Sequence, residues 1–395
     1  MAKKNGVPEN NNQERDTTLV HAGTNPHAHE GAFNTPVYHA STILFPTVKD
    51  LEDNQTRPLS YGIRGTPTMR ALQEALTELE DAHGAIITPS GLSAVTTALL
   101  SVLKSGDHVL IADSVYSPTR HFCAKILPRY GIDVSFYPPR IGAAISDLFR
   151  AETCAVFLES PGSLTFDIQD VPAIADSAHK AELWVLMDNS WASPLFFQPL
   201  HHEVDISIQA LTKYVSGHAD VMLGSIATNE RAWTPVDNTH QALGLTAGPD
   251  DIYMALRGMR TLGVRLPRHQ ESALTVARWL EARPEVEAVL YPALESHADH
   301  DLWQRDFSGA SGLFSVILKP RSARAVAAML DSMAYFGMGY SWGGMESLIL
   351  PVTPHRTAGS WEVTGPMLRI HIGLEDSKDL IHDLEAGFER LRSVD

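Results

Sequence analysis

Two charged residues each end an apolar stretch of this chain. Asp188 closes the run Leu183–Met187, and Lys213 follows the run Ile206–Ala210, 25 positions after Asp188. A buried carboxylate needs a cation or several hydrogen-bond donors, and a lysine after an apolar strand can act as a nucleophile or form a Schiff base. Taken alone, Asp188 could cap the next turn and Lys213 could be a surface lysine. Together they indicate chemistry that needs both an acid and an amine.

A third feature adds an anion site to this pair. Pro89-Ser90-Gly91-Leu92-Ser93 follows an apolar stretch and opens a predicted helix, Ser93–Leu103. The first turn of a helix offers free N–H groups, and a glycine there lets a phosphate approach the backbone. A glycine at a turn is weak evidence by itself. A phosphate cup, an acid and a lysine in this order nevertheless match pyridoxal 5′-phosphate (PLP), which needs a Schiff-base lysine and an acidic partner for its ring nitrogen.

The elements that must position these residues form a repeating pattern. Helical segments, beginning with Thr66–Gly84, alternate with short apolar runs that are typical of parallel strands buried on both faces. Ligands of such sheets bind beyond the carboxyl ends of the strands, which is where Asp188 and Lys213 lie. The predicted strands are His108–Ala112, Val134–Tyr137, Ala155–Leu158, Leu183–Met187, Ile206–Ala210 and Val221–Ala227.

The pattern divides the chain into three parts. Residues 1–65 are expected to form an extended arm, with a flexible leader of about sixteen residues, that contacts a neighbouring subunit. Residues 66–261 are the predicted cofactor-binding α/β domain, and residues 262–395 a smaller α+β domain. In and near the smaller domain we expect a long helix, Asp250–Ala282, broken near Leu266-Pro267. The other elements expected there are strands Val286–Leu290, Leu313–Leu318 and Leu368–Ile372 and helices Ser322–Asp331 and Asp379–Arg392.

Composition narrows the class of protein. The 395 residues are 44% hydrophobic, enough for a sizeable core, and the formal net charge of −16 opposes binding to nucleic acid or to an anionic membrane. The two cysteines, Cys123 and Cys154, exclude a disulfide framework and fit a reducing cytoplasm. The polar N-terminus does not resemble a secretory signal, and no apolar stretch is long enough to predict a membrane span.

Several motifs resemble one enzyme family. They include Ser60-Tyr61-Gly-Ile-Arg64-Gly-Thr-Pro-Thr68, Glu159-Ser-Pro161, Thr212-Lys213-Tyr214, Tyr340-Ser341-Trp342-Gly-Gly and Leu368-Arg369-Ile-His. From about Thr17 to its end the chain resembles the Cys/Met-metabolism (trans-sulfuration) branch of fold-type I PLP-dependent enzymes. This resemblance implies an aspartate aminotransferase-like α/β fold with a large, open, mostly parallel sheet. Within the branch, Trp342 and the stretch Asp205–Lys213 most resemble the cystathionine β-lyases, because γ-acting relatives usually carry Leu at that tryptophan.

The resemblance also implies roles for matched positions. Lys213 would carry the cofactor and transfer protons, while Tyr116 would stack on the ring and help to deprotonate the incoming amine. Arg369 would grip the substrate α-carboxylate with its two-pronged guanidinium. Asp188 would pair with the ring nitrogen. The other implied positions are Gly91, Leu92 and Thr212 at the phosphate, Tyr61 from a neighbouring subunit, and Tyr340, Ser341 and Trp342 in the substrate pocket.

Three positions depart from the family pattern. Ile63 stands where the family usually has a phosphate-binding arginine, so Arg64 is predicted to supply that contact. Ala210 replaces a serine that often contributes a phosphate hydroxyl. Ser163 replaces an asparagine that usually reaches the cofactor.

The expected reaction is α,β-elimination of L-cystathionine to L-homocysteine, pyruvate and ammonia, a step of methionine biosynthesis. The alternatives are a cystathionine γ-lyase, a γ-synthase, a methionine γ-lyase, or a broad cysteine-S-conjugate β-lyase or cysteine desulfhydrase. Two further alternatives do not involve carbon–sulfur lyase chemistry: a PLP-binding regulatory protein and an aldolase that forms a Schiff base through its lysine. The expected partners are a small amino-acid thioether and further copies of the chain, in a tetramer built from dimers that share active sites. No metal is expected, because His21, His27, His29 and His39 lie in the irregular arm without ligand spacing.

Overall fold

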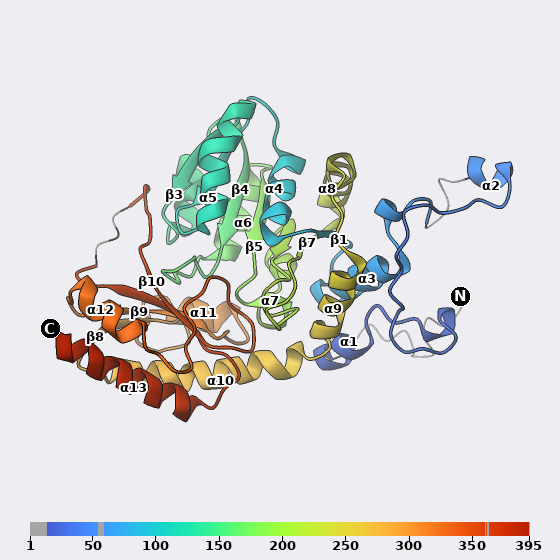
Figure 1. Ribbon diagram of the computed structural model, residues 1–395. Coiled ribbons are helices and arrows are strands. Elements are labelled where there is room, and N and C mark those ends of the chain that lie inside the picture. Colours follow the sequence, from blue (N-terminus) through green and yellow to red (C-terminus); the bar gives the residue numbers. More distant parts are fainter. Residues whose placement is uncertain (1–13, 54–58, 360, 362, 395) are drawn as a thin grey trace.

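A large open sheet forms the centre of the chain (Figure 1). The computed structural model describes residues 14–53, 59–359, 361 and 363–394. Within them, seven strands pair in the order β1-β7-β6-β5-β4-β2-β3, and β7 alone runs against its neighbours. The sheet is therefore mostly parallel, as predicted. Its strands are β1 (Gly84–Thr88), β2 (His108–Ala112), β3 (Asp133–Tyr137), β4 (Thr153–Glu159), β5 (Trp184–Asp188), β6 (Ile206–Gln209) and β7 (Gly224–Thr228).

Helices connect and cover these strands. The first long one, α3, starts with Pro67 directly after Thr66, whose side-chain oxygen accepts the N–H of Met69 at 3.3 Å. Proline suits this position because the first helical N–H groups have no partner within the helix. The helices of this part are α3 (Pro67–Glu80), α4 (Gly91–Val102), α5 (Ser117–His121), α6 (Val171–Lys180), α7 (Ser193–Phe196), α8 (Glu230–Leu243) and α9 (Pro249–Met259).

A second, smaller sheet follows. Its four strands are antiparallel in the order β10-β11-β9-β8, and α10 and α13 run beneath it in Figure 1. The strands are β8 (Val286–Leu290), β9 (Leu313–Leu318), β10 (Leu348–Val352) and β11 (Met367–His371). The helices are α10 (Leu262–Glu281), α11 (His300–Asp306), α12 (Ala323–Leu330) and α13 (Ser377–Val394).

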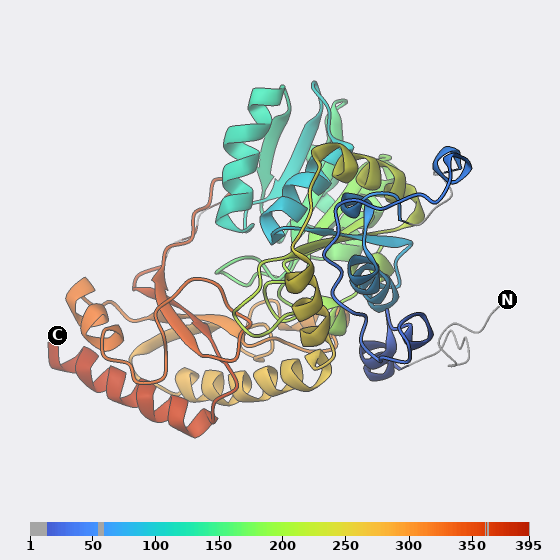
Figure 2. The ribbon, with the colours of Figure 1, turned by 45° about the vertical axis from the view of Figure 1, so that its right-hand side comes forward.

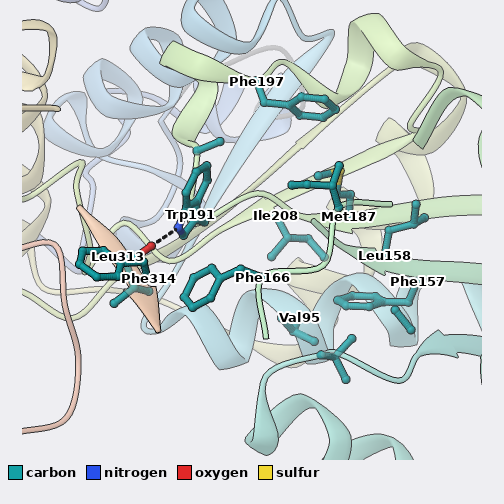
Figure 3. Packing of buried hydrophobic residues seen from close by; sticks show 14 of the residues in the cluster. Val95, Phe157, Leu158, Phe166, Met187, Trp191, Phe197, Ile208, Leu313 and Phe314 are labelled. Atoms are coloured by element: carbon teal, nitrogen blue, oxygen red, sulfur yellow. Dashed lines mark hydrogen bonds between the residues drawn. The ribbon is translucent and has the colours of Figure 1, made fainter. Parts of the chain in front are cut away.

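Apolar packing joins the two sheets. Trp191, in the segment after β5, donates its indole N–H to the carbonyl of Leu313 in β9 at 2.9 Å (Figure 3). Phe166 and Phe314 belong to the same buried cluster, and Figure 3 shows them beside this contact. The core is therefore continuous from the large sheet to the small one, which places β11 and the loop before β10 near the large sheet.

Most predicted elements are confirmed within one or two residues, but one expectation is wrong and one strand was not predicted. The break predicted near Leu266-Pro267 falls instead between Met259 and Leu262, and Pro267 lies inside α10. Proline removes one helical hydrogen bond, yet Leu262 and Leu266 are both fully buried and hold this turn in place. Strand β10, which contains Pro351, was not among the predicted strands. Proline is tolerated there because β10 is the edge strand of the small sheet, and Pro351 lies opposite Leu368 of β11.

The N-terminal part differs from a uniformly extended arm. Helix α1 (Arg15–His21) packs on its own subunit, where Leu19 is buried and Arg260 donates to the carbonyls of Leu19 and Ala22 at 2.7 and 2.8 Å. Beyond it, the segment that carries α2 (Val48–Glu52) projects away from the rest of the chain in both views (Figures 1 and 2). The expected leader lies mostly outside the described residues.

Candidate active site

Two carboxylates lie side by side at the carboxyl end of the large sheet. Asp188 ends β5 and Glu159 ends β4, and the two are direct partners in the parallel ladder between these strands. Burial raises the pKa of both carboxyls, most strongly that of Glu159, whose pKa the neighbouring charge of Asp188 raises further. Hydrogen bonds from Ser190, and then the charge of Lys213, act against burial at Asp188. Glu159 belongs to a quoted motif but had no predicted role. The signal that singled out Asp188, an acid ending an apolar strand, also applies to it.

Asp188 is held through one of its two oxygens. Its Oδ1 accepts the N–H of Ser190 at 2.9 Å and the Ser190 hydroxyl at 2.6 Å, while Ser190 Oγ accepts the N–H of Ala210 at 2.7 Å. Among the described residues, Oδ2 has no hydrogen-bond partner. A buried carboxylate with one free oxygen suits a protonated ring nitrogen, because the cation would offset the cost of burying the charge.

Lys213 lies in the turn after β6 and reaches the small domain. Its Nζ donates to Ser341 Oγ at 2.7 Å and lies 5.0 Å from the centre of the Trp342 ring. Burial, and then the nearby Arg369 guanidinium, lower the pKa of Lys213 to about 8, although Asp188 acts in the opposite direction. Roughly a tenth of such an amine is uncharged at pH 7, far more than for an ordinary lysine, and this fraction can react with a carbonyl.

The first turn of α4 lies at the same edge of the sheet. Ser90 caps the helix by accepting the N–H of Ser93 at 3.1 Å, and the N–H groups of Gly91 and Leu92 have no partner among the described residues. A Cβ at Gly91 would lie 2.6 Å from the Cβ of Ala210, so only glycine fits this approach of α4 to the end of β6. Two free amides at a helix start suit a phosphate.

Thr212 is less available than predicted. Its hydroxyl donates to the carbonyl of Leu223 at 3.1 Å and accepts the N–H of Leu223 at 3.0 Å. A phosphate contact from Thr212 would therefore share an oxygen that already ties two segments together. The free amides of α4, the half-satisfied Asp188 and the amine of Lys213 together fit PLP as a bound cofactor.

Tyr116 stands at the start of α5, after β2. Its N–H donates to Glu159 Oε2 at 2.8 Å, and its side chain is 47% exposed. Burial of the hydroxyl, and then the charge of Glu159, raise the pKa of Tyr116, while Arg369 lowers it. The hydroxyl therefore keeps its proton at neutral pH, and the ring face remains accessible to a planar ligand.

The substrate residues predicted in the small domain come together around one turn. Arg369 in β11 donates from Nη2 to the carbonyl of Ser341 at 2.9 Å. Trp342 packs against Tyr214 with ring centres 5.4 Å apart. Tyr340 is 90% exposed, so it lines no closed pocket within one chain.

Tyr61 and Arg64 are the two predicted residues that the chain does not bring to Lys213. Tyr61 forms an isolated bridge with Thr42 and is half-exposed. Arg64 lines a separate hollow of about 430 Å³ between α3, β1 and α8, with Trp233 among its walls. A role for either residue at the cofactor therefore requires a second subunit.

Within the described ranges, no three His, Cys, Asp or Glu side chains gather in a way that could hold a metal ion. No helix in that same part of the chain is both long and apolar enough to cross a membrane.

The sequence and fold are similar to those of known proteins. Residues 16–389 match the family model described as Cys/Met metabolism PLP-dependent enzyme. The chain is 50% identical to a putative cystathionine β-lyase of Rhizobium johnstonii, with 96% of this chain and 97% of that protein covered. It is 42% identical to the cystathionine β-lyase of Salmonella typhimurium, covering 95% and 98% of the two chains.

Relatives with other activities are similar as well. An L-alanine/L-glutamate racemase of Wolbachia pipientis is 42% identical, with 95% of this chain and 97% of that protein covered. The crystal structure of cystathionine γ-synthase from Xanthomonas oryzae, in complex with aminoacrylate and cysteine, superposes with a TM-score of 0.90 at 30% identity, covering 97% and 99% of the two chains. Identity alone therefore does not separate elimination at the β-carbon from related reactions.

Proposed function

Because this chain belongs to the Cys/Met metabolism family of PLP-dependent enzymes, we propose that it catalyses α,β-elimination of L-cystathionine. One observation supports this most directly. The amine of Lys213, with a pKa lowered to about 8, lies between Asp188 at the end of β5 and the Ser341-Trp342 turn of the small domain. In this arrangement Lys213 would transfer protons between a cofactor site and a substrate pocket.

The large domain would hold the cofactor. PLP, when bound, supplies a ring that accepts electrons from the substrate Cα. Asp188 would pair with the ring nitrogen through its free oxygen, and the amides of Gly91 and Leu92 would bind the phosphate. Tyr116 would lie against the ring face.

The substrate would lie between Lys213 and the small domain. Arg369 would bind the α-carboxylate, exchanging its contact with the Ser341 carbonyl for a charged one. Lys213 would remove the Cα proton and return a proton to the departing homocysteine thiolate. The three-carbon remainder would hydrolyse to pyruvate and ammonia, so that the atoms of cystathionine and one water balance.

We propose a cytoplasmic homo-oligomer, a tetramer built from two dimers that share active sites. The projecting arm supports this, because it exposes large apolar side chains that a second copy could cover. They are Phe33, Leu44, Val48 and Leu51. Tyr61 and Arg64 would then reach the cofactor of a neighbouring subunit.

The test is product analysis with purified holoenzyme and L-cystathionine. We expect pyruvate and homocysteine in equal amounts, and a loss of at least about 10³-fold in turnover for Lys213→Ala, because proton transfer by a positioned group contributes on this scale. Predominant 2-oxobutyrate would move the reaction to the γ-carbon. Undiminished turnover by Lys213→Ala would refute the assigned role of the lysine.

A second candidate is amino-acid racemisation, which is favoured by the racemase at 42% identity. Both reactions begin with removal of the Cα proton, but racemisation also needs a second acid to return a proton to the opposite face. Tyr116 keeps its proton at neutral pH and is the candidate for that acid. Formation of D-alanine from L-alanine, at a rate comparable with pyruvate release from L-cystathionine, would establish this activity.

A further inference from the structure

The turn that carries Ser341 and Trp342 has an unfavourable backbone. Ser341 has a φ of 76° and Gly343 a φ of 88°. A serine in this region costs free energy and persists only when its surroundings hold it. A Cβ at Gly343 would lie 2.9 Å from the carbonyl carbon of Lys213 and from the N of Tyr214, so the turn packs directly on the lysine backbone.

Three side chains hold this turn. Lys213 donates to the hydroxyl of Ser341 at 2.7 Å, and Arg369 donates to its carbonyl at 2.9 Å. The third is His371, whose Nε2 lies 3.1 Å from the N of Gly343 and 3.2 Å from the carbonyl oxygen of Gly344. Arg369 and His371 are two residues apart in β11, so both point to the same side of the small sheet.

Two of these three contacts conflict with the proposed reaction. Lys213 must turn to the cofactor and then to the substrate Cα, and Arg369 must turn to the α-carboxylate. Both would release Ser341 when the turn has to line the substrate pocket. His371 is the one holder of the three that no step of the reaction employs.

The surroundings of His371 keep its ring fixed and neutral. The side chain is 1% exposed, and its ring centre lies 5.4 Å from that of His269 and 6.0 Å from that of Tyr214. Burial, and then His269, lower the pKa of His371 to about 3. Its two neutral tautomers can each bind the turn: Nε2 accepts the Gly343 N–H in one and donates to the Gly344 carbonyl in the other.

We propose that His371 is a positioning residue that keeps the Ser341–Gly343 turn over Lys213 while Lys213 and Arg369 engage cofactor and substrate. The inference rests on the proposed function for the roles of those two residues. Its consequence is a division of labour on β11, where Arg369 binds the substrate and His371 presets the pocket that receives it.

The test compares three variants as holoenzymes. His371→Leu keeps a buried side chain but cannot form a hydrogen bond. His371→Gln places an amide at the reach of Nε2, and an amide can accept or donate. His269→Leu is the matched control, because His269 is a fully buried neutral histidine of the same cluster whose Nδ1 binds Ile372 and not the turn.

Two measurements distinguish positioning from general destabilisation. The first is KM and kcat for L-cystathionine, and the second is the Kd of L-alanine from the change in cofactor absorbance. For His371→Leu we expect both KM and Kd to rise about 10-fold with a smaller change in kcat, which indicates lost ground-state binding. His371→Gln should return within about 3-fold of the parent protein, as should His269→Leu despite a lower Tm.

An unchanged KM and Kd in His371→Leu would overturn the proposal, and so would an equal rise in His269→Leu or a failure of His371→Gln to restore binding. If His371→Leu does not fold, His371→Asn replaces it, because its shorter amide does not reach Gly343. The titration with L-alanine measures binding through cofactor absorbance and does not depend on the release of pyruvate. A parent protein that releases none would refute the proposed function, while the titration would still decide the role of His371.

Discussion

The two sides of the candidate site are built in different ways. On the large-domain side, Asp188 is fixed by a parallel ladder in which it pairs with Glu159 and Ile208. On the small-domain side, Ser341 and Trp342 lie in a turn outside any strand or helix, with a φ of 76° at Ser341. A ladder holds each residue through many backbone hydrogen bonds, whereas the turn depends on a few side chains. The ladder therefore fixes Asp188 firmly, whereas the Ser341-Trp342 turn is suited to adapting to the substrate.

The largest loss of activity that tests this comparison is expected for a substitution at Asp188. Asp188→Asn keeps the shape and the Ser190 contacts but cannot stabilise a protonated ring nitrogen, so we expect kcat to fall by at least about 100-fold, as for loss of a main electrostatic contact. Stopped-flow or steady-state pyruvate assays measure this. Ser190→Ala is the control, because it leaves the carboxylate in place and should cost far less. A kcat for Asp188→Asn above a tenth of the parent value would contradict the role.

Substitutions at Ser341 test the turn on the small-domain side of the site. Ser341→Ala removes the hydroxyl, which would face the substrate once Lys213 has released it, but keeps the unfavourable φ, and Ser341→Gly removes both. We expect KM for L-cystathionine to rise several-fold in each, roughly 1 kcal/mol for one hydrogen bond. The glycine variant should also have the higher Tm of the two, because glycine tolerates positive φ. A Tm for Ser341→Gly below that of Ser341→Ala would show that the turn is not strained.

The smallest effect on catalysis is expected at a buried acid far from the turn. Glu80 of α3 accepts hydrogen bonds from Ser207 and Gln209 in β6, and burial raises its pKa from 4.5 to about 7. Below about pH 4.5 the carboxyl is protonated in both states, and its contribution to stability is fully present. As pH rises towards 7 the unfolded chain loses this proton first, so the unfolding free energy falls, by up to about 3 kcal/mol.

Glu80→Gln should remove this pH dependence. We expect its Tm, relative to the parent, to be higher at pH 8 than at pH 5, with kcat/KM unchanged. Thermal unfolding at the two pH values measures the difference. Glu74→Gln is the matched control, because Glu74 lies on the exposed side of the same helix. A Tm difference that is the same at both pH values would show that Glu80 is ionised in the folded protein.

Much of the fold followed from local patterns. The apolar runs before Asp188 and Lys213 predicted their strands, and Ser90-Gly91 predicted the start of a helix there, which is α4. The proline-containing β10 and the break before α10 did not follow. Both depend on partners elsewhere in the chain, an edge position beside β11 in one case and the burial of Leu262 and Leu266 in the other.

The sequence by itself determined the chemistry, because an acid and a lysine at neighbouring strand ends lie together in any parallel sheet with that strand order. Only the tertiary structure decided how the substrate side is held. Ser341 meets Lys213 from 128 positions away, and His371, in β11, accepts the N–H of Gly343. The sequence of β11 shows only that Arg369 and His371 lie on the same face and does not indicate which residue either of them contacts. Contacts of this length depend on how the two sheets pack, and no local periodicity records that packing.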